Sequence, residues 1–292
     1  MNRRLVRSLV ALSVLLLTTA ASLIFLQRHP SVGRQLLGTS PIILGLLLGL
    51  YLLFMVSLWL IFRSSLIICN VRLPQRETLL VTAYSSIINF FGPLQSGPAF
   101  RALYLKKQHA VSLKQYTSAS LVYYFFYACY SALFLIVGVF GWLILPVGLL
   151  LLGGVFFFLR RPLAKVSLRF RQLGQLSWRG IVLTALATLL QVSIFAVIFY
   201  VELHSVNHGV SVRQAFIYTG AANFALFVSL TPGAIGFRES FVLLTQQLHH
   251  IPDATVIAAS LLDRGVYVAM LLLLGVAIFG TQGRASIKRI KS

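Results

Sequence analysis

Two stretches of the chain, 89–101 and 223–239, combine glycine and proline breaks with an arginine, Arg101 or Arg238. An arginine close to the free amides of a helix N-terminus is well suited to bind an anion such as a lipid phosphate. Arg101 has no acidic neighbour in the sequence, which makes it the first candidate for that role. The alternative is that its long side chain reaches the cytoplasmic interface a few residues away.

Acidic residues are scarce in this chain. There are five of them, namely Glu77, Glu202, Glu239, Asp253 and Asp263. We expect Glu77, Glu202 and Asp253 at the ends of spans, where a solvated carboxylate costs little. Glu239 and Asp263 are different, because each lies inside an apolar region next to an arginine.

A charge at membrane depth normally has a partner or faces a watery cavity. Neighbours in a helix point about 100° apart, so Arg238 and Glu239 cannot satisfy each other. The sequence therefore predicts cross-helix pairs, with Glu239 reaching Arg264 and Asp263 reaching Arg238. Such a cluster could serve as a structural or gating network, bring Arg238 or Arg264 to a substrate phosphate, or relay protons.

The other candidate binding residues are small or neutral. They are Asn89, Gly92, Gly97, Tyr123, Tyr127, Asn223, Gly233 and Gly236. Glycine lets backbone approach backbone or ligand closely, and asparagine can cap free backbone groups or bond between helices. Tyr123 and Tyr127 form a helical stripe with Tyr130, which either lines a cavity or packs against neighbouring helices.

Composition places these residues in a membrane. The chain has 292 residues, of which 58% are hydrophobic and 10% are charged, too few polar residues to cover a soluble domain. The formal net charge of +20 does not indicate nucleic-acid binding, because the basic residues lie between apolar runs. They are typical of orientation signals and of contacts with anionic lipid.

No cofactor or metal site is expected. His204 and His208 have the i, i+4 spacing of a metal chelate, but no carboxylate or cysteine stands at a matching position. His249 and His250 are interpreted as loop residues.

The predicted fold is an all-α polytopic membrane protein with six transmembrane helices and two re-entrant broken-helix hairpins. Apolar stretches long enough to cross the bilayer lie near residues 8–26, 41–62, 117–140, 142–159, 180–201 and 254–280. The stretch 8–26 could be a signal peptide, but its length favours an uncleaved first helix. Two further stretches, 78–105 and 214–248, are each split into half-length pieces.

If both split stretches are hairpins, most lysines and arginines collect on one side, as the positive-inside rule expects of the cytoplasmic face. Both termini are then cytoplasmic, and the membrane is expected to be a bacterial inner membrane. Span, hairpin and span recur in inverted orientation, a plan common in alternating-access transporters. The single domain, 1–292, divides into a first helix and loop (1–40), repeat 1 (41–140), a connecting helix and basic loop (141–179), repeat 2 (180–280) and a basic tail (281–292).

The second hairpin, Ser229-Leu-Thr-Pro-Gly-Ala-Ile-Gly-Phe-Arg-Glu239, followed by Asp263-Arg264, resembles the flippase-like membrane domain of lysylphosphatidylglycerol synthases. Gly92-Pro93, Gly97 and Arg101-Ala-Leu-Tyr-Leu in the first hairpin resemble the first motif of the same family. The resemblance implies a polytopic bundle that moves a polar lipid between leaflets. Where many relatives have an acidic-Arg pair after the first hairpin, this chain has Tyr123-Tyr124.

Taken together, these features predict a lipid flippase or transporter that moves a polar or anionic lipid between leaflets by alternating access. The alternative is a non-catalytic, lipid-binding membrane subunit that supports a partner enzyme of envelope or glycolipid synthesis. An enzyme is not expected, because no catalytic pair is recognisable in the sequence and none of the chain resembles the soluble synthase domain.

Overall fold

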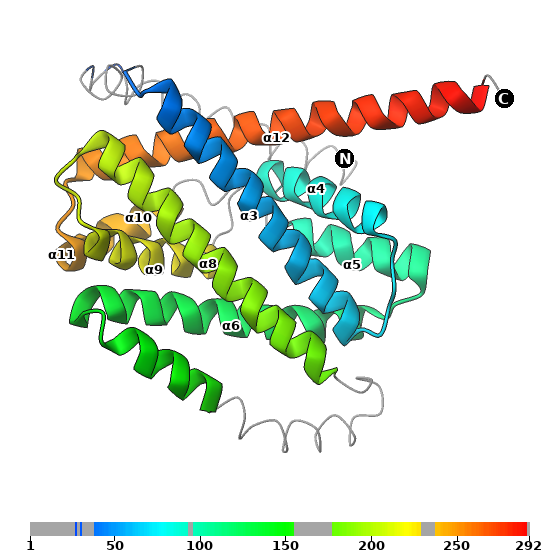
Figure 1. Cartoon of the computed structure of the whole chain (residues 1–292), viewed down its shortest axis with the longest axis horizontal. Helices are drawn as coiled ribbons and strands as arrows, with labels where there is room; N and C mark the ends of the chain where they lie inside the picture. Colours follow the sequence, from blue (N-terminus) through cyan, green and yellow to red (C-terminus); the bar gives the residue numbers. More distant parts are fainter. Residues whose placement is uncertain are drawn as a thin grey trace, which may run out of the picture.

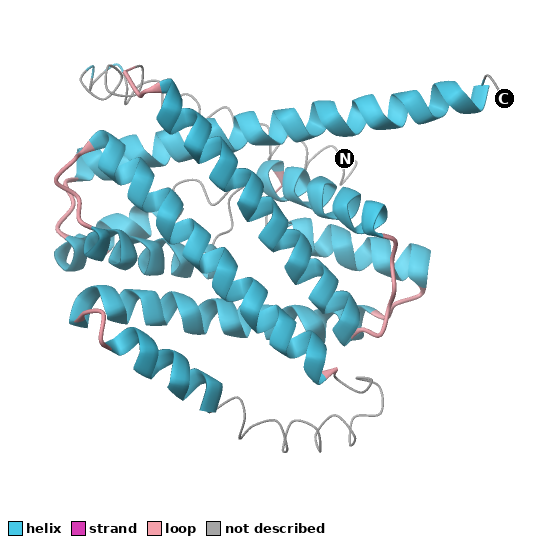
Figure 2. Cartoon of the chain, in the orientation of Figure 1, coloured by secondary structure: helices cyan, strands magenta, loops and turns pink. Residues whose placement is uncertain are grey.

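The computed structural model describes residues 38–92, 96–154, 177–228 and 237–290, together with Gln27 and Pro30. These residues are helical apart from short connections, and no strand occurs among them (Figure 2). The main helices are α3 (Pro41–Ile68), α4 (Gln75–Phe91), α5 (Ser96–His109), α6 (Leu113–Phe140), α8 (Trp178–Val206), α9 (Val212–Val228), α10 (Phe237–Leu244), α11 (Gln246–His249) and α12 (Asp253–Ile290). The expected first span, 8–26, and two candidate site residues, Gly233 and Gly236, lie outside the described residues.

Four of the described helices are long and apolar enough to cross a membrane: α3, α6, α8 and the Asp253–Ile278 part of α12. With 28, 28, 29 and 26 residues, each exceeds the roughly 20 residues that about 30 Å of hydrocarbon requires. They correspond to four of the predicted spans. For the expected span 142–159, the described part is a shorter apolar helix, Ile144–Gly154.

The two broken stretches fold as pairs of short helices. In the first, α4 has 17 residues and α5 has 14, so each is about 20 to 26 Å long and falls short of the hydrocarbon thickness. In the second, α9 has 17 residues and α10 has 8. The glycine and proline breaks therefore mark the ends of half-length helices, as the sequence predicts.

Hydrogen bonds show where each hairpin begins and returns. The amide of Gln115, at the start of α6, donates to the backbone oxygen of Cys69, just after α3, at 2.8 Å. The α4–α5 hairpin therefore leaves and returns at one end of the bundle. At the other hairpin, the side-chain amide of Gln214, at the start of α9, donates to the backbone oxygen of His249, at the end of α11, at 2.8 Å. The chain that leaves through α9 therefore returns to the same end of the bundle after α10 and α11.

These two closures lie at opposite ends of the bundle. Arg213 donates to the backbone oxygen of Gly138 at 2.6 Å, so the start of α9 meets the end of α6. The start of α8 meets the end of α3, where a Cβ on Gly180 would lie 2.7 Å from Ile68 Cγ1. Figure 1 shows α3 and α8 side by side and running in opposite directions.

Small residues bring helices of the two halves together. A Cβ on Gly220 of α9 would lie 2.6 Å from Leu135 Cβ, and one on Gly138 of α6 would lie 2.5 Å from Ile217 Cγ1. Because lipid is as apolar as the helix surfaces, helices in a bilayer associate through this kind of close packing. The interface between α6 and α9 is therefore held at near-backbone contact.

Two expectations from the sequence are wrong. Glu202, expected to be solvated at a span end, is 1% exposed, because α8 extends to Val206 and packs on this side against α3 and α12. His249, interpreted as a loop residue, is the last residue of α11 and is fully buried. Glu77 does lie at a helix start, where its carboxylate accepts from Tyr104 at 2.6 Å and contacts His109 at 2.6 Å.

Candidate functional site

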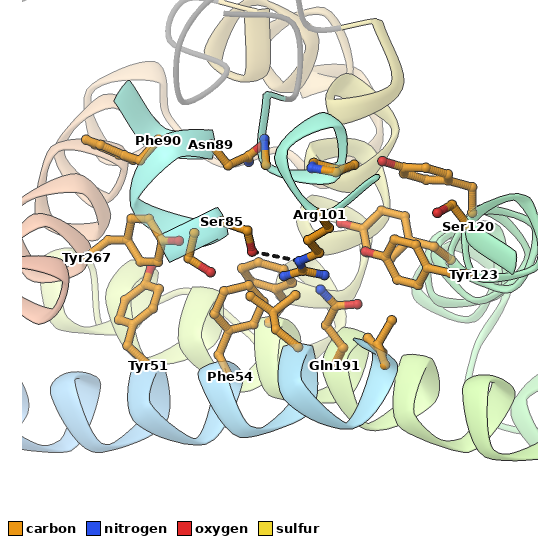
Figure 3. Close-up of a pocket in the computed structure, with 18 of the residues that line it drawn as sticks. Tyr51, Phe54, Ser85, Asn89, Phe90, Arg101, Ser120, Tyr123, Gln191 and Tyr267 are labelled. Atoms are coloured by element: carbon orange, nitrogen blue, oxygen red, sulfur yellow. Dashed lines mark hydrogen bonds between the residues drawn. The ribbon is translucent and has the colours of Figure 1, made fainter. Parts of the chain in front are cut away.

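A cavity of about 240 Å³ lies between the two hairpins and the long helices. Its wall includes residues of α3, α4, α5, α6, α8, α10 and α12. Both hairpins therefore reach the same space, although one enters from each end of the bundle. Figure 3 shows the polar side chains that converge on this space.

Arg101 points into the cavity from α5 (Figure 3). Its Nε donates to the hydroxyl of Ser85 on α4 at 2.6 Å, and its guanidinium carbon lies 5.2 Å from the ring centre of Phe62. Within the described part of the chain, no carboxylate forms an ion pair with it. The side chain therefore faces inward, into the cavity.

The second hairpin contributes arginine in a different setting. Arg238 on α10 forms an ion pair with Asp263 on α12 at 2.5 Å, and Arg264 on α12 forms one with Glu239 on α10. This is the cross-helix arrangement that the sequence predicts. The neighbours Arg238 and Glu239 are separated by 3.9 Å between their nearest charged atoms.

Hydroxyl groups link the two ion pairs. Ser260 accepts from Arg238 at 3.1 Å and donates to Glu239, and the hydroxyl of Tyr51 on α3 donates to Asp263. Arg238, Asp263 and Arg264 line the cavity, whereas Glu239 lies behind them. The cluster therefore forms one wall of the cavity and ties α10 to α12 and α3.

The electrostatic balance of the wall favours an anion. Arg238 of the second hairpin and Arg264 of α12 are matched by two carboxylates, which leaves Arg101 as the cation without an acidic partner in the described cavity wall. A charge-assisted hydrogen bond from a guanidinium is about twice as strong as a neutral one. A phosphate in the cavity would supply the missing counter-charge.

Neutral polar groups make up much of the remaining wall. Tyr123, Tyr124 and Tyr127 of α6 line the cavity. The third member of the predicted stripe, Tyr130, stacks on Phe126 at a ring distance of 6.0 Å and is not part of the wall. The stripe therefore serves both purposes, with two tyrosines in the wall and one in helix packing.

The two asparagines have different roles. Asn89 lines the cavity, and its side-chain oxygen accepts from the backbone N–H of Gly97 at 3.2 Å, so it caps the start of α5. Asn223 is 1% exposed and accepts from Tyr127 at 2.8 Å, which joins α9 to α6. It supports the wall from behind.

The glycines of the first hairpin allow α4 and α5 to approach closely. A Cβ on Gly97 would lie 2.5 Å from the backbone oxygen of Ser85, and one on Gly92 would lie 2.2 Å from Ser96 Oγ. Gly97 lines the cavity and Gly92 does not. Because Ser85 also accepts from Arg101, the close approach at Gly97 helps to position the arginine.

Several polar wall residues were not singled out from the sequence, among them Tyr51, Ser85 and Gln191. Tyr51 and Gln191 interrupt long aliphatic runs, which is the signal that could have identified them, since polar groups inside a span usually face the bundle interior. Ser85 gives no comparable signal, because serine is common on the faces along which transmembrane helices pack.

The family model of the lysylphosphatidylglycerol synthase TM region matches residues 5–275. The chain belongs to this family. The match contains both arginine-bearing hairpins and all of the cavity wall. Comparison with curated proteins gives no match. Membership in the lysylphosphatidylglycerol synthase TM region family confirms the resemblance seen in the hairpin motifs, and with the four apolar helices it establishes an integral membrane protein.

Proposed function

We propose that this chain moves a lipid with an anionic headgroup between the leaflets of a membrane and makes no covalent change to it. The observation that carries the proposal is the cavity, in which Arg101 faces polar side chains from both hairpins without an acidic partner among the described residues. The headgroup would lie in this space while the acyl chains stay in lipid.

The volume and lining of the cavity support a headgroup as the occupant. A cavity of about 240 Å³ approaches the lower end of the roughly 300–1,000 Å³ of ordinary ligand pockets. It is large enough for a phosphate and a few attached polar groups, and it is far too small for a whole phospholipid. Hydroxyls of Ser85, Ser120 and Tyr123 line the wall beside Arg101.

The arrangement of the hairpins supports alternating access. We infer that α3–α6 and α8–α12 are inverted repeats and that the two hairpins are re-entrant from opposite faces of the membrane, in a bundle of six spans. Broken helices that meet near the midplane of an inverted repeat form the substrate sites of many transporters. The end of the bundle that carries Arg76, Lys106 and Lys114 would be cytoplasmic by the positive-inside rule.

The test is transport by the purified chain in proteoliposomes. Headgroup-intact lipids with a fluorescent acyl chain would be placed in one leaflet, and their appearance in the other would be measured by chemical quenching, with phosphatidylglycerol, phosphatidate and phosphatidylcholine compared. We expect faster crossing of the anionic lipids. Arg101→Ala should slow that crossing about 10- to 100-fold, which corresponds to the loss of one charged hydrogen bond of about 1.5–3 kcal/mol.

Arg63→Ala is the matched control. Arg63 is also an arginine of the first half, but it is exposed and lies over the ring of Trp59 at 4.9 Å. It should leave the rate unchanged. Unchanged crossing rates for the whole lipid panel would contradict transport. If the crossing rates are unchanged and an enzyme copurifies with the chain in a fixed ratio, the alternative of a lipid-binding subunit is supported instead.

A further inference from the structure

Glu202 has no role in the site as described so far. It lies near the C-terminal end of α8 and is 1% exposed. One of its carboxyl oxygens, Oε1, has no hydrogen-bond partner, and no ion pair involves Glu202 among the described residues. A buried carboxylate without a cation is costly, so a carboxyl group in this position is more stable with a proton bound.

The ionisable groups around Glu202 come from four helices. They are Tyr51 of α3, Tyr218 of α9, Arg238 of α10 and Asp263 of α12. Among them, Arg238 and Asp263 neutralise each other, and the adjoining pair of Glu239 and Arg264 is also neutral. An ionised Glu202 would therefore add one uncompensated negative charge to a balanced cluster.

The hydroxyl of Tyr51 supports the same protonation state. It has a single proton, which it donates to Asp263. It also lies close to the carboxyl group of Glu202. Since its proton is already used, a hydrogen bond between Tyr51 and Glu202 would need Glu202 as the donor.

We propose that Glu202, with Tyr51 and Asp263, forms a proton-binding site that couples proton movement to lipid movement. Proton uptake forms one O–H bond on Glu202 at the expense of hydronium from the solvent, and release returns the proton to water. No oxidation or group transfer takes place. The site adjoins the cavity, because Tyr51 and Asp263 belong to its wall.

Arg238 provides the physical link between the proton and the lipid. Its Nε, like Oε1 of Glu202, is buried and unpartnered among the described residues. When Glu202 loses its proton, its carboxylate becomes a complementary acceptor for this N–H and competes with Asp263 for the arginine. The cluster beside the cavity then carries one more negative charge, which disfavours an anionic headgroup.

The sign of the coupling follows from this charge change. The protonated form of Glu202 accommodates an anionic headgroup, and the ionised form repels it. Proton and headgroup therefore bind together, and by reciprocity a bound headgroup strengthens proton binding. A proton gradient would drive an anionic lipid in the same direction as the proton.

The existence of the proton site can be tested without any transport measurement. Infrared difference spectra of the full chain in phosphatidylcholine vesicles, recorded across a pH titration, report the C=O stretch of a protonated carboxyl group. We expect that band at neutral pH in the wild type, its loss in Glu202→Gln and its retention in Glu202→Asp. Glu77→Gln, which removes a partly exposed carboxylate, is the control and should keep the band.

Absence of the band at neutral pH, or its persistence in Glu202→Gln, would overturn the proton site.

The coupling rests on the proposed function and needs a second measurement: crossing of phosphatidylglycerol in proteoliposomes with an imposed pH gradient. The wild type should respond to the gradient, and Glu202→Gln should carry lipid at a rate independent of it. If the wild type carries lipid at a rate that does not depend on the gradient, the coupling is overturned. If the chain carries no lipid at all, the transport function is contradicted, and the infrared result alone decides the proton site.

Discussion

Arg101 and Arg238 face one cavity from different hairpins, Arg101 on α5 and Arg238 on α10. Their surroundings differ, because Arg238 is paired with Asp263, whereas Arg101 donates to the hydroxyl of Ser85 and has no carboxylate partner among the described residues. The two arginines are therefore not equivalent. Arg101 is available for an anion, and Arg238 becomes available only when its ion pair is rearranged.

This difference predicts unequal effects on lipid binding and on stability. Arg101→Ala should weaken retention of phosphatidylglycerol about 10- to 100-fold with little change in thermal stability. Arg238→Ala should lower the stability as well, since it leaves Asp263 without its cation. Mass spectrometry of retained lipid, paired with thermal unfolding of the same samples, measures both. Equal loss of stability in the two variants would contradict the assignment.

The Arg238–Asp263 ion pair predicts a strong asymmetry between single and double substitution. Asp263→Asn leaves the buried guanidinium of Arg238 without its closest carboxylate, with Glu239 at 3.9 Å as the nearest remaining one, and should cost about 3–5 kcal/mol of unfolding free energy. Arg238→Gln combined with Asp263→Asn should cost less than the sum of the two single changes. Asp253→Asn is the control, because Asp253 is exposed in the first turn of α12 and should cost less than about 1 kcal/mol. Additive effects in the double-mutant cycle would mean that the pair is not coupled.

Gly97 should be intolerant of a side chain. Its added Cβ would meet the backbone oxygen of Ser85 at 2.5 Å, so Gly97→Ala must separate α4 from α5 at a cost of about 1–3 kcal/mol. The shift would also displace Arg101 from Ser85 and reduce lipid binding. Gly45→Ala is the control, because nothing lies within 4 Å of its added Cβ, and it should stabilise α3 by about 0.5–1 kcal/mol. Thermal unfolding and lipid retention of both variants check this prediction.

The buried hydrogen bond from Tyr127 to Asn223 should hold α6 to α9. Tyr127→Phe leaves the side-chain oxygen of Asn223 without its 2.8 Å donor, at a cost of about 1–3 kcal/mol. Tyr130→Phe is the control on the same helix face, since its ring stacks on Phe126, and it should change stability by less than about 0.5 kcal/mol. Chemical denaturation in detergent compares the two, and equal effects would argue against the hydrogen bond.

The buried ring of His249 should make the folded protein less stable in acid. Its ring accepts from the backbone N–H of Ile251 at 3.0 Å and contacts the backbone oxygen of Val242 at 3.0 Å, an arrangement that fits a neutral imidazole. Burial lowers the pKa of His249 below its ordinary value of 6.5. Because the folded pKa is depressed, this stabilisation is present above about pH 6.5 and is lost as pH falls through the folded value.

The measurement is thermal unfolding between pH 7.5 and pH 5. The wild type should lose stability over this interval, and His249→Gln should show a flatter dependence from a lower starting value. His250→Asn is the control: His250 is exposed with a φ of 53°, a conformation that asparagine tolerates. Because burial is the main cause of the lowered pKa of His249, the variant should keep most of the wild-type pH dependence. A wild type with constant stability over the interval would contradict the prediction.

Much of the architecture could be predicted from local chemistry. An apolar run long enough for the bilayer must be helical, because lipid offers no partner for free backbone groups, and α3, α6, α8 and α12 follow from that rule. The breaks at Gly92 and near Gly233 indicated half-length helices. The angle between neighbours on a helix was enough to predict that Glu239 and Asp263 reach arginines on the opposite helix.

Other features needed the tertiary structure. Glu202 stands near the end of an apolar run, a position that the sequence alone does not distinguish from that of Glu77, which is partly exposed. Its burial is decided by the packing of α3 and α12 over the end of α8. Likewise, the sequence does not show that Tyr123 and Tyr127 reach the cavity while Tyr130 packs in the helix interior, because that depends on how α6 is rotated against its neighbours.

The sequence by itself determined which segments are helical, where two of them break and which charges need partners, because these depend on the transfer of backbone and charged groups into lipid. Only the tertiary structure decided that Arg101 and Arg238 share one cavity and that Glu202 lies buried beside Asp263. Those relationships depend on the contact of α8, α10 and α12, which lie far apart in the chain from α5, and no local pattern specifies how such helices meet.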